Sequence, residues 1–219
     1  MYKLVCFDVD GTLIDNTASI WHVFHRHFRV DERIRNDAIR GYKSGKITYE
    51  EWAMHDVMLW HKMGKQRSDF ISAMVSSKLR LMDGAMDTLS ALRKRGMKLV
   101  IISGSISIVL EHLLPRYQEI FDDVFISHIH FDDKGGISSL KATEYDMEGK
   151  ATALRKVALK HGVSVNECVF VGDNTNDVGV AKEAGLSIAF NPKDKSLVEA
   201  SDIVITCADI SRILPHILG

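Results

Sequence analysis

Two aspartates one residue apart near the start of the chain are its strongest chemical feature. Asp8 and Asp10 follow the apolar run at residues 4–7, which has the composition of a buried strand. Carboxylates at the end of a buried strand are costly unless a partner compensates their charge. A divalent cation can do so, and hard oxygen ligands suit Mg²⁺. A carboxylate can also attack phosphorus as a covalent nucleophile.

A Ser-Gly-Ser sequence follows a second apolar run, at residues 98–102. We expect Ser103 and the amide of Gly104 to bind phosphate oxygens at the N-terminus of a helix over residues 106–114. Taken alone, the same three residues are compatible with an ordinary helix cap and turn.

A third polar segment, residues 172–177, follows the apolar run at residues 168–171. Asp173 in this segment can share Mg²⁺ with Asp8. Lys150, which opens a predicted helix, can pair with a phosphoryl group and with Asp8. Each feature also has a simpler explanation, because Asx-rich turns need no ligand and most lysines on helices are solvated.

Together these groups are suited to hydrolysis of a phosphate ester, which needs a nucleophile, charge neutralisation and a proton donor. Asp8 can attack phosphorus. Asp10 can protonate the leaving alcohol and then take a proton from water, provided that its surroundings raise its pKa. Ligands of open parallel sheets bind beyond the carboxyl ends of the strands, which is where all these groups are predicted to lie.

The elements that must position these residues alternate between strand and helix. Apolar runs at residues 98–102, 168–171, 187–190 and 203–206 are predicted to be buried strands, and helical patterns fall at 85–95, 106–114, 150–161, 177–184 and 210–218. This order predicts a doubly wound, Rossmann-like α/β fold, with a parallel sheet covered on both faces.

Two regions interrupt the alternation. Residues 15–82 contain no convincing strand and read as a series of helices. Residues 124–145 read as a β-hairpin with an Asp/Gly turn at 132–136. We therefore expect a core domain of residues 1–14 and 84–219, with a helical cap domain at residues 15–83.

Composition limits the classes of function. The 219 residues carry a net charge of -1, which gives no reason to expect nucleic acid or an anionic membrane as a partner. No apolar stretch is long enough to span a membrane, and the first strand starts too early for a secretory signal. Cys6, Cys168 and Cys207 lack metal-site spacing and are expected to be buried, reduced thiols, so we expect a cytoplasmic protein.

The motifs DVDGTL (residues 8–13), IISGS (101–105) and GDNTND (172–177), with Lys150 between them, resemble those of the haloacid dehalogenase-like hydrolase superfamily. The run AGLSIAFNP (184–192) resembles it as well, so that the resemblance covers nearly the whole chain. The inserted helices, which contain GKITYEE (45–51), resemble the cap of the phosphoserine phosphatase branch.

The resemblance implies roles for individual residues. Asp8 would form an aspartyl-phosphate, and Asp10 would be the general acid/base with its backbone carbonyl on Mg²⁺. Asp8 and Asp173 would be the other metal ligands, and Asp177 would support the metal shell or Lys150. Ser103, Gly104 and Lys150 would hold the phosphate, and Asn176 would bind phosphate or substrate.

The sequence departs from the phosphoserine phosphatase pattern at the positions that recognise the substrate. Thr17 stands where the pattern has a glutamate, and Asp56 stands where it has an arginine that clamps the substrate carboxylate. Arg40 or Lys43 is a candidate substitute for that arginine. Ser105 replaces a glycine and adds a hydroxyl near the phosphate.

Trp52, Asp56 and Trp60 are spaced to share one helix face. This face is expected to pack inside the cap, with Asp56 at its edge. The alternative is a cap wall that faces the site, in which aromatic rings and one acid would bind an amine or quaternary ammonium group. The histidines are expected to pack or lie at the surface rather than bind metal: His22, His25, His27, His55, His61, His128 and His130.

The leading hypothesis is a Mg²⁺-dependent phosphatase acting on a small phosphorylated metabolite, as a monomer or homodimer. The alternatives are a true phosphoserine phosphatase with another carboxylate clamp, and a phosphatase for an amine-bearing phosphoester. Phosphoryl transfer to another acceptor is also open, and a dehalogenase is disfavoured because Asp10 is present. A non-catalytic binding protein on the same fold is the least favoured.

Overall fold

The computed structural model describes the backbone of residues 1–219 and every side chain except that of residue 148. A seven-stranded sheet forms its centre, in the order β6-β5-β4-β1-β7-β8-β9. All neighbouring strands run parallel except β5 and β6, which form the predicted hairpin. The strands are β1 (Leu4–Phe7), β4 (Lys98–Ile106), β5 (Asp123–Phe131), β6 (Ile137–Lys141), β7 (Cys168–Gly172), β8 (Leu186–Phe190) and β9 (Ile203–Ile205).

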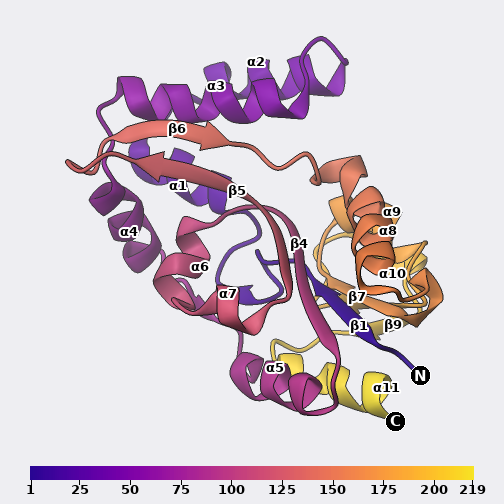
Figure 1. Ribbon diagram of the computed structural model, residues 1–219. Helices are drawn as coiled ribbons and strands as arrows, with labels where there is room; N and C mark the ends of the chain where they lie inside the picture. The colour runs from indigo at the N-terminus through magenta and orange to yellow at the C-terminus, as the bar shows by residue number, and fades with distance from the viewer.

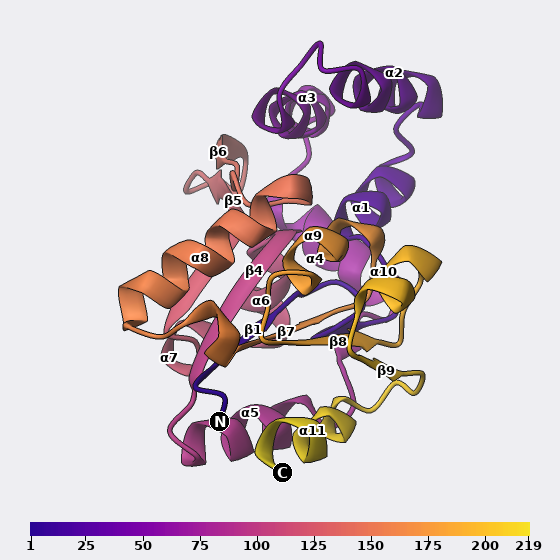
Figure 2. The same cartoon turned by 90° about the vertical axis from the view of Figure 1, so that its right-hand side faces the viewer.

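Alternate residues of β1 face two different cores. Val5 and Phe7 belong to the larger core, together with side chains from α5 and α11, whereas Leu4 and Cys6 pack with α8 and α9. Figure 2 shows α8 and α9 on one side of the sheet, with α5 and α11 below it beside both termini. This is the predicted doubly wound α/β arrangement, and its helices are α5 (Ala85–Lys94), α6 (Ile108–Leu113), α7 (Tyr117–Ile120), α8 (Lys150–His161), α9 (Val178–Ala181), α10 (Lys195–Ala200) and α11 (Leu214–Leu218).

Four short 3₁₀ turns complete this part of the chain: η1 (Met147–Gly149), η2 (Val165–Glu167), η3 (Thr175–Asp177) and η4 (Ile210–Ile213). One of them, η4, takes the place of predicted α-helix, and another, η3, leads into a helix shorter than predicted. The expected helix at 177–184 is η3 followed by the four-residue α9, and the one at 210–218 is η4 followed by α11.

The helical insertion, residues 15–83, leaves the core after β1. It is bounded by a two-stranded antiparallel ribbon of β2 (Ile14–Asp15) and β3 (Arg80–Leu81), so the expectation of no strand in this region misses two short strands. Its helices α2 and α3 lie at the end of the molecule away from both termini, and β6 runs beside α3 (Figure 1). The helices are α1 (Ile20–Phe28), α2 (Glu32–Lys43), α3 (Tyr49–Lys62) and α4 (Arg67–Ser76).

Aromatic packing holds the insertion together. Phe24, Phe28, Trp60 and Phe70 form edge-to-face and stacked pairs with ring centroids 4.8–6.0 Å apart. Phe70 also contacts Phe131 of β5 at 5.6 Å, which ties the insertion to the sheet. At the start of α3, Thr48 and Glu51 form a capping box that fixes where this helix begins.

Two predictions about local structure are wrong. Strand β4 continues to Ile106 and α6 begins only at Ile108, so Ser103 and Gly104 lie in a strand and not at a helix N-terminus. Cys6 and Cys168 are buried free thiols as expected, but Cys207 is exposed. Over the residues that the structure describes, no helix is both long and apolar enough to cross a membrane.

Candidate active site

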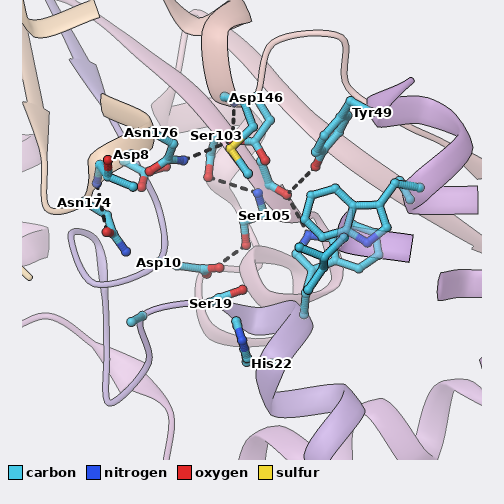
Figure 3. A pocket seen from close by; sticks show the side chains of 18 of the residues that line it. Asp8, Asp10, Ser19, His22, Tyr49, Ser103, Ser105, Asp146, Asn174 and Asn176 are labelled. Carbon is cyan, nitrogen blue, oxygen red and sulfur yellow. Dashed lines mark hydrogen bonds between the residues drawn. The ribbon is translucent and has the colours of Figure 1, made fainter. Parts of the chain in front are cut away.

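A cavity of about 370 Å³ lies between the carboxyl ends of the central strands and the helical insertion. Its lower part is formed by residues that follow β1 and β7 and by the last part of β4, and its upper part by residues of α1, α2 and α3. The predicted site residues that line it are Asp8, Asp10, Asp56, Ser103, Gly104, Ser105, Asp173 and Asn176, and Figure 3 shows most of them together.

Lys150 lies behind the cavity and joins two carboxylates. Its Nζ is 2.9 Å from Asp8 Oδ1 and 2.6 Å from Asp177 Oδ1, and all three side chains are buried. Burial alone would lower the pKa of Lys150, but the charges of Asp177 and Asp8 outweigh it and raise this pKa, so the lysine stays charged. The ammonium therefore compensates part of the negative charge at Asp8.

The carboxylate of Asp173 has the properties of a metal ligand. Both of its carboxylate oxygens are buried and have no hydrogen-bond partner among the described residues. Burial, and then the charges of Asp8 and Asp177, raise the pKa of Asp173 to about 9. Oxygen atoms of Asp8, Asp173 and Asp177 lie within 4.8 Å of one another, which fits a hard divalent cation.

Gly11 makes room for Asp173. A Cβ at this position would lie 2.0 Å from Asp173 Oδ2, and the residue has a φ of +75°. Only glycine meets both conditions without strain. The glycine that follows the two aspartates therefore allows the Asp173 carboxylate, just after β7, to approach the segment that follows β1.

Asp10 points into the cavity from a different direction. Its Oδ1 accepts from Ser105 Oγ at 2.8 Å and its Oδ2 from the backbone N–H of Ile20 at 2.7 Å (Figure 3 shows the first bond). Burial raises the pKa of Asp10 to about 7, with a smaller contribution from the charge of Asp8. A carboxyl group that is partly protonated near neutral pH can donate and accept a proton in one reaction cycle.

Asp146 lines the cavity but was missed in the sequence. Its Oδ1 accepts from Asn176 Nδ2 at 3.0 Å and from the backbone N–H of Met147 at 2.7 Å. Its carboxylate packs directly against Gly104, where an added Cβ would lie 2.0 Å from Asp146 Oδ2. The one signal in the sequence was its position four residues before Lys150, which is too weak to single out one acid.

The insertion contributes two cations to the upper part of the cavity, Arg35 and Lys43. Arg35 was not predicted, and its guanidinium contacts His22 Nε2. Burial and the charge of Arg35 lower the pKa of His22 to about 4, so this histidine is neutral.

Of the two candidate substitutes for the family arginine, Lys43 lines the cavity, whereas Arg40 is exposed and pairs with Asp37. Thr17 is absent from this lining among the described residues.

Asp56 also lines the cavity, but both of its oxygens are engaged. Oδ2 is 2.8 Å from His25 Nε2 and Oδ1 is 3.1 Å from His55 Nδ1. Trp60 Nε1 donates to His25 Nδ1 at 3.3 Å, so the ring of His25 carries its proton on Nε2 and donates it to Asp56. The face shared by Trp52, Asp56 and Trp60 therefore runs from the cavity into the aromatic core.

None of the seven histidines considered above belongs to a potential metal-binding group in the part of the chain that the structure describes. His25 is buried in hydrogen bonds, and His128 and His130 stack with ring centroids 6.5 Å apart.

Comparison with known proteins identifies the family. The model of the haloacid dehalogenase-like hydrolases matches residues 2–185. Phosphoserine phosphatase of Methanocaldococcus jannaschii is 26% identical over 98% of this chain and 97% of its own length. Phosphoserine phosphatase SerB2 of Mycobacterium tuberculosis is 28% identical over 97% of this chain, which spans 49% of that protein.

Solved structures agree with the sequence relatives. A phospho-aspartyl intermediate analogue of phosphoserine phosphatase matches with a TM-score of 0.76 and 26% identity over 99% of both chains. A substrate-bound phosphoserine phosphatase complex matches with a TM-score of 0.74 and 25% identity, again over 99% of both chains. The chain therefore belongs to the haloacid dehalogenase-like hydrolases, and it is a phosphoserine phosphatase-like phosphoric monoester hydrolase.

Proposed function

We propose that the protein is a Mg²⁺-dependent phosphatase that hydrolyses a small phosphomonoester through an aspartyl-phosphate on Asp8. The observation that carries this proposal is the arrangement of Asp8, which lines the cavity, pairs with Lys150 and shares an acidic cluster with Asp173. Because Lys150 and a bound cation both offset the negative charge in this region, a phosphate dianion can approach the attacking carboxylate.

In the first half of the reaction, Asp8 attacks phosphorus and the bond to the leaving alcohol breaks. Asp10, whose pKa is raised to about 7, donates a proton to the leaving oxygen. In the second half, Asp10 takes a proton from water, the water oxygen attacks phosphorus, and the bond to Asp8 breaks. Ser103, Gly104, Lys150 and Asn176 are the residues we propose to hold the phosphoryl oxygens.

Asp8, Asp173 and the backbone carbonyl of Asp10 are the ligands we propose for Mg²⁺, with Asp177 holding Lys150 in place. The buried, unpartnered oxygens of Asp173 fit such a cation. When bound, Mg²⁺ would neutralise charge on the phosphoryl group during transfer.

We further propose that residues 15–83 act as a cap domain on a core of residues 1–14 and 84–219. The cavity lies where the two meet, so closure of the cap would exclude water from the phosphorylated intermediate. The relatives named above are phosphoserine phosphatases, which makes phosphoserine the first substrate to test. Arg35 and Lys43 are candidates to bind the carboxylate of phosphoserine, and Asp56 is a candidate to bind its amine.

Hydrolysis of p-nitrophenyl phosphate in the presence of Mg²⁺ tests the proposal. We expect Asp8→Asn to lower kcat by about 10³-fold or more, because it removes the nucleophile. The matched control is Asp37→Asn, an exposed acid of α2 outside the cavity, which should leave activity unchanged.

Removal of Mg²⁺ with EDTA should abolish turnover, and added Mg²⁺ should restore it. An Asp8→Asn variant as active as the wild-type protein would rule out the covalent mechanism. Unchanged turnover in EDTA would rule out the metal.

A further inference from the structure

The first turn of α1 contacts two parts of the phosphoryl-binding end of the cavity. The backbone N–H of Ile20 donates to Asp10, and the indole N–H of the next residue, Trp21, donates to the carbonyl oxygen of Gly104 at 2.8 Å. A second donor to the same carbonyl, the hydroxyl of Tyr49 at 3.4 Å, comes from α3. Two helices of the insertion therefore hold one peptide group of β4.

The orientation of this peptide group has a consequence for Ser103. In a trans peptide the C=O of Gly104 and the N–H of Ser105 point in opposite directions. With the carbonyl held by Trp21, the Ser105 N–H donates to Ser103 Oγ at 3.1 Å. A hydroxyl oxygen that accepts in this way still has its own proton to donate.

The Ser103 side chain is buried and lines the cavity, and among the described residues its hydroxyl donates no hydrogen bond. The remaining direction for this O–H is into the cavity. The phosphoryl group proposed above would supply the missing acceptor.

The opposite side of Gly104 is also fixed. The Asp146 carboxylate occupies the space that a Cβ would take, so that Gly104 is enclosed between this acid and the indole of Trp21. Trp21 is itself held, because its ring stacks on that of the buried Trp60 with centroids 5.5 Å apart. Trp60 in turn donates a hydrogen bond to His25. The buried polar network of the insertion therefore helps to fix the position of Trp21.

On the basis of the phosphatase function, we propose that Trp21 is a positioning residue: its indole N–H holds the Gly104 carbonyl, and this orients the Ser103 hydroxyl toward the phosphoryl group. The docked insertion thereby completes the phosphate-binding end of the core. Trp21 acts through the peptide group and not by touching the reacting atoms.

The test compares Trp21→Phe, which keeps an aromatic ring but lacks the N–H, with Tyr2→Phe as the control. Tyr2 also donates a hydrogen bond to a glycine carbonyl, that of Gly185, but it lies outside the cavity. The probe is inorganic phosphate as a competitive inhibitor of p-nitrophenyl phosphate hydrolysis with Mg²⁺ present.

We expect Trp21→Phe to raise the phosphate Ki and lower kcat/KM by about tenfold, the size of one lost hydrogen bond. Tyr2→Phe should stay within about twofold of wild type on the same scale. Equal phosphate affinity in the two variants would overturn the proposal.

A double-mutant cycle separates positioning from a general structural role. In a Ser103→Ala background, Trp21→Phe should change the phosphate Ki by less than about twofold, because the hydroxyl on which Trp21 acts is absent. A full tenfold change in that background would show that Trp21 does not act through Ser103. A lower Tm of Trp21→Phe with an unchanged Ki would also overturn the proposal.

If Trp21→Phe does not fold, benzothienylalanine at position 21 repeats the test, since it keeps the shape of the ring system and loses only the N–H. The outcomes also separate this inference from the function on which it rests. A wild-type protein that neither hydrolyses phosphate esters nor binds phosphate contradicts the proposed function. An active wild type with unaltered phosphate binding in Trp21→Phe contradicts the role of Trp21 alone.

Discussion

At the scale of single residues, the positive charge of Lys150 compensates the charges of two buried carboxylates. Its side chain has no exposed surface, and its ammonium lies between Asp8 and Asp177. Breaking a buried ion pair by removing one partner costs far more than the pair contributes, because the remaining charge is left uncompensated. The contacts of Lys150 with Asp8 and Asp177 therefore also stabilise the core.

We expect Lys150→Met to lower the free energy of unfolding by about 3–5 kcal/mol. The loss has its origin in the two carboxylates that would stay buried without their cation. Urea denaturation would measure it, with Lys156→Met, an exposed residue of the same helix, as the control. Mg²⁺ should restore more stability to Lys150→Met than to the wild type. A variant as stable as the wild-type protein would contradict this account.

At the scale of elements, a small charged cluster at Asp122 joins one helix to two neighbouring strands of the sheet. This residue precedes β5, and its carboxylate accepts from Arg93 Nη1 at 2.8 Å, from Lys98 Nζ at 2.8 Å and from the backbone N–H of Leu99 at 3.0 Å. Burial acts to raise the pKa of Asp122, but these partners outweigh it and lower the pKa overall. Helix α5, strand β4 and strand β5 thus share one carboxylate.

The lowered pKa of Asp122 predicts the pH dependence of stability. A group with a folded-state pKa below its unfolded value stabilises the fold above that unfolded value, and the contribution is lost as pH falls through the folded pKa. We expect Asp122→Asn to reduce the free energy of unfolding at neutral pH and to flatten its decline below about pH 4. Thermal melts from neutral to acidic pH would test this, with Asp87→Asn, an exposed acid of α5, as the control. Parallel curves for Asp122→Asn and the wild type would refute it.

At the scale of the whole molecule, the cavity belongs to neither part of the chain alone. One end is lined by residues in or directly after β1, β4 and β7, and the opposite wall comes from the insertion. The three tryptophans, Trp21, Trp52 and Trp60, all lie in the insertion, and two of them line the cavity. Tryptophan fluorescence therefore reports on the insertion without a background from the core.

We expect a saturable change in tryptophan fluorescence when Mg²⁺ and beryllofluoride, a mimic of a phosphorylated carboxylate, are added together. Attachment at Asp8 would draw the insertion onto the core through Trp21 and Gly104. Asp8→Asn should abolish the response, and Asp37→Asn should keep it. An identical response in Asp8→Asn would show that the signal does not originate at Asp8.

Local periodicity was enough to predict the sheet, the hairpin and the helical insertion. The strands at β1, β4, β7, β8 and β9 were recognised because buried parallel strands are short, continuous apolar runs. The end of β4 was not recognised as strand, because Ser103, Gly104 and Ser105 are poor strand formers in isolation. They lie where the register between β4 and β5 shifts, between Ile102 and Ile106, and the carbonyl of Gly104 accepts hydrogen bonds from α1 and α3, which are tertiary contacts.

The sequence by itself determined the family, the α/β fold and the set of chemical groups, because motif order and apolar periodicity are properties of the chain alone. Only the tertiary structure decided which groups share a cavity and what each one contacts. It brought Asp146 and Arg35 to the site, engaged both oxygens of Asp56 with histidines, and placed the N–H of Trp21 on Gly104. The hydrogen bonds between Asp56 and His25, Trp21 and Gly104, and Asn176 and Asp146 join residues 30–83 positions apart. Local sequence patterns carry no information about which residues pair over such separations.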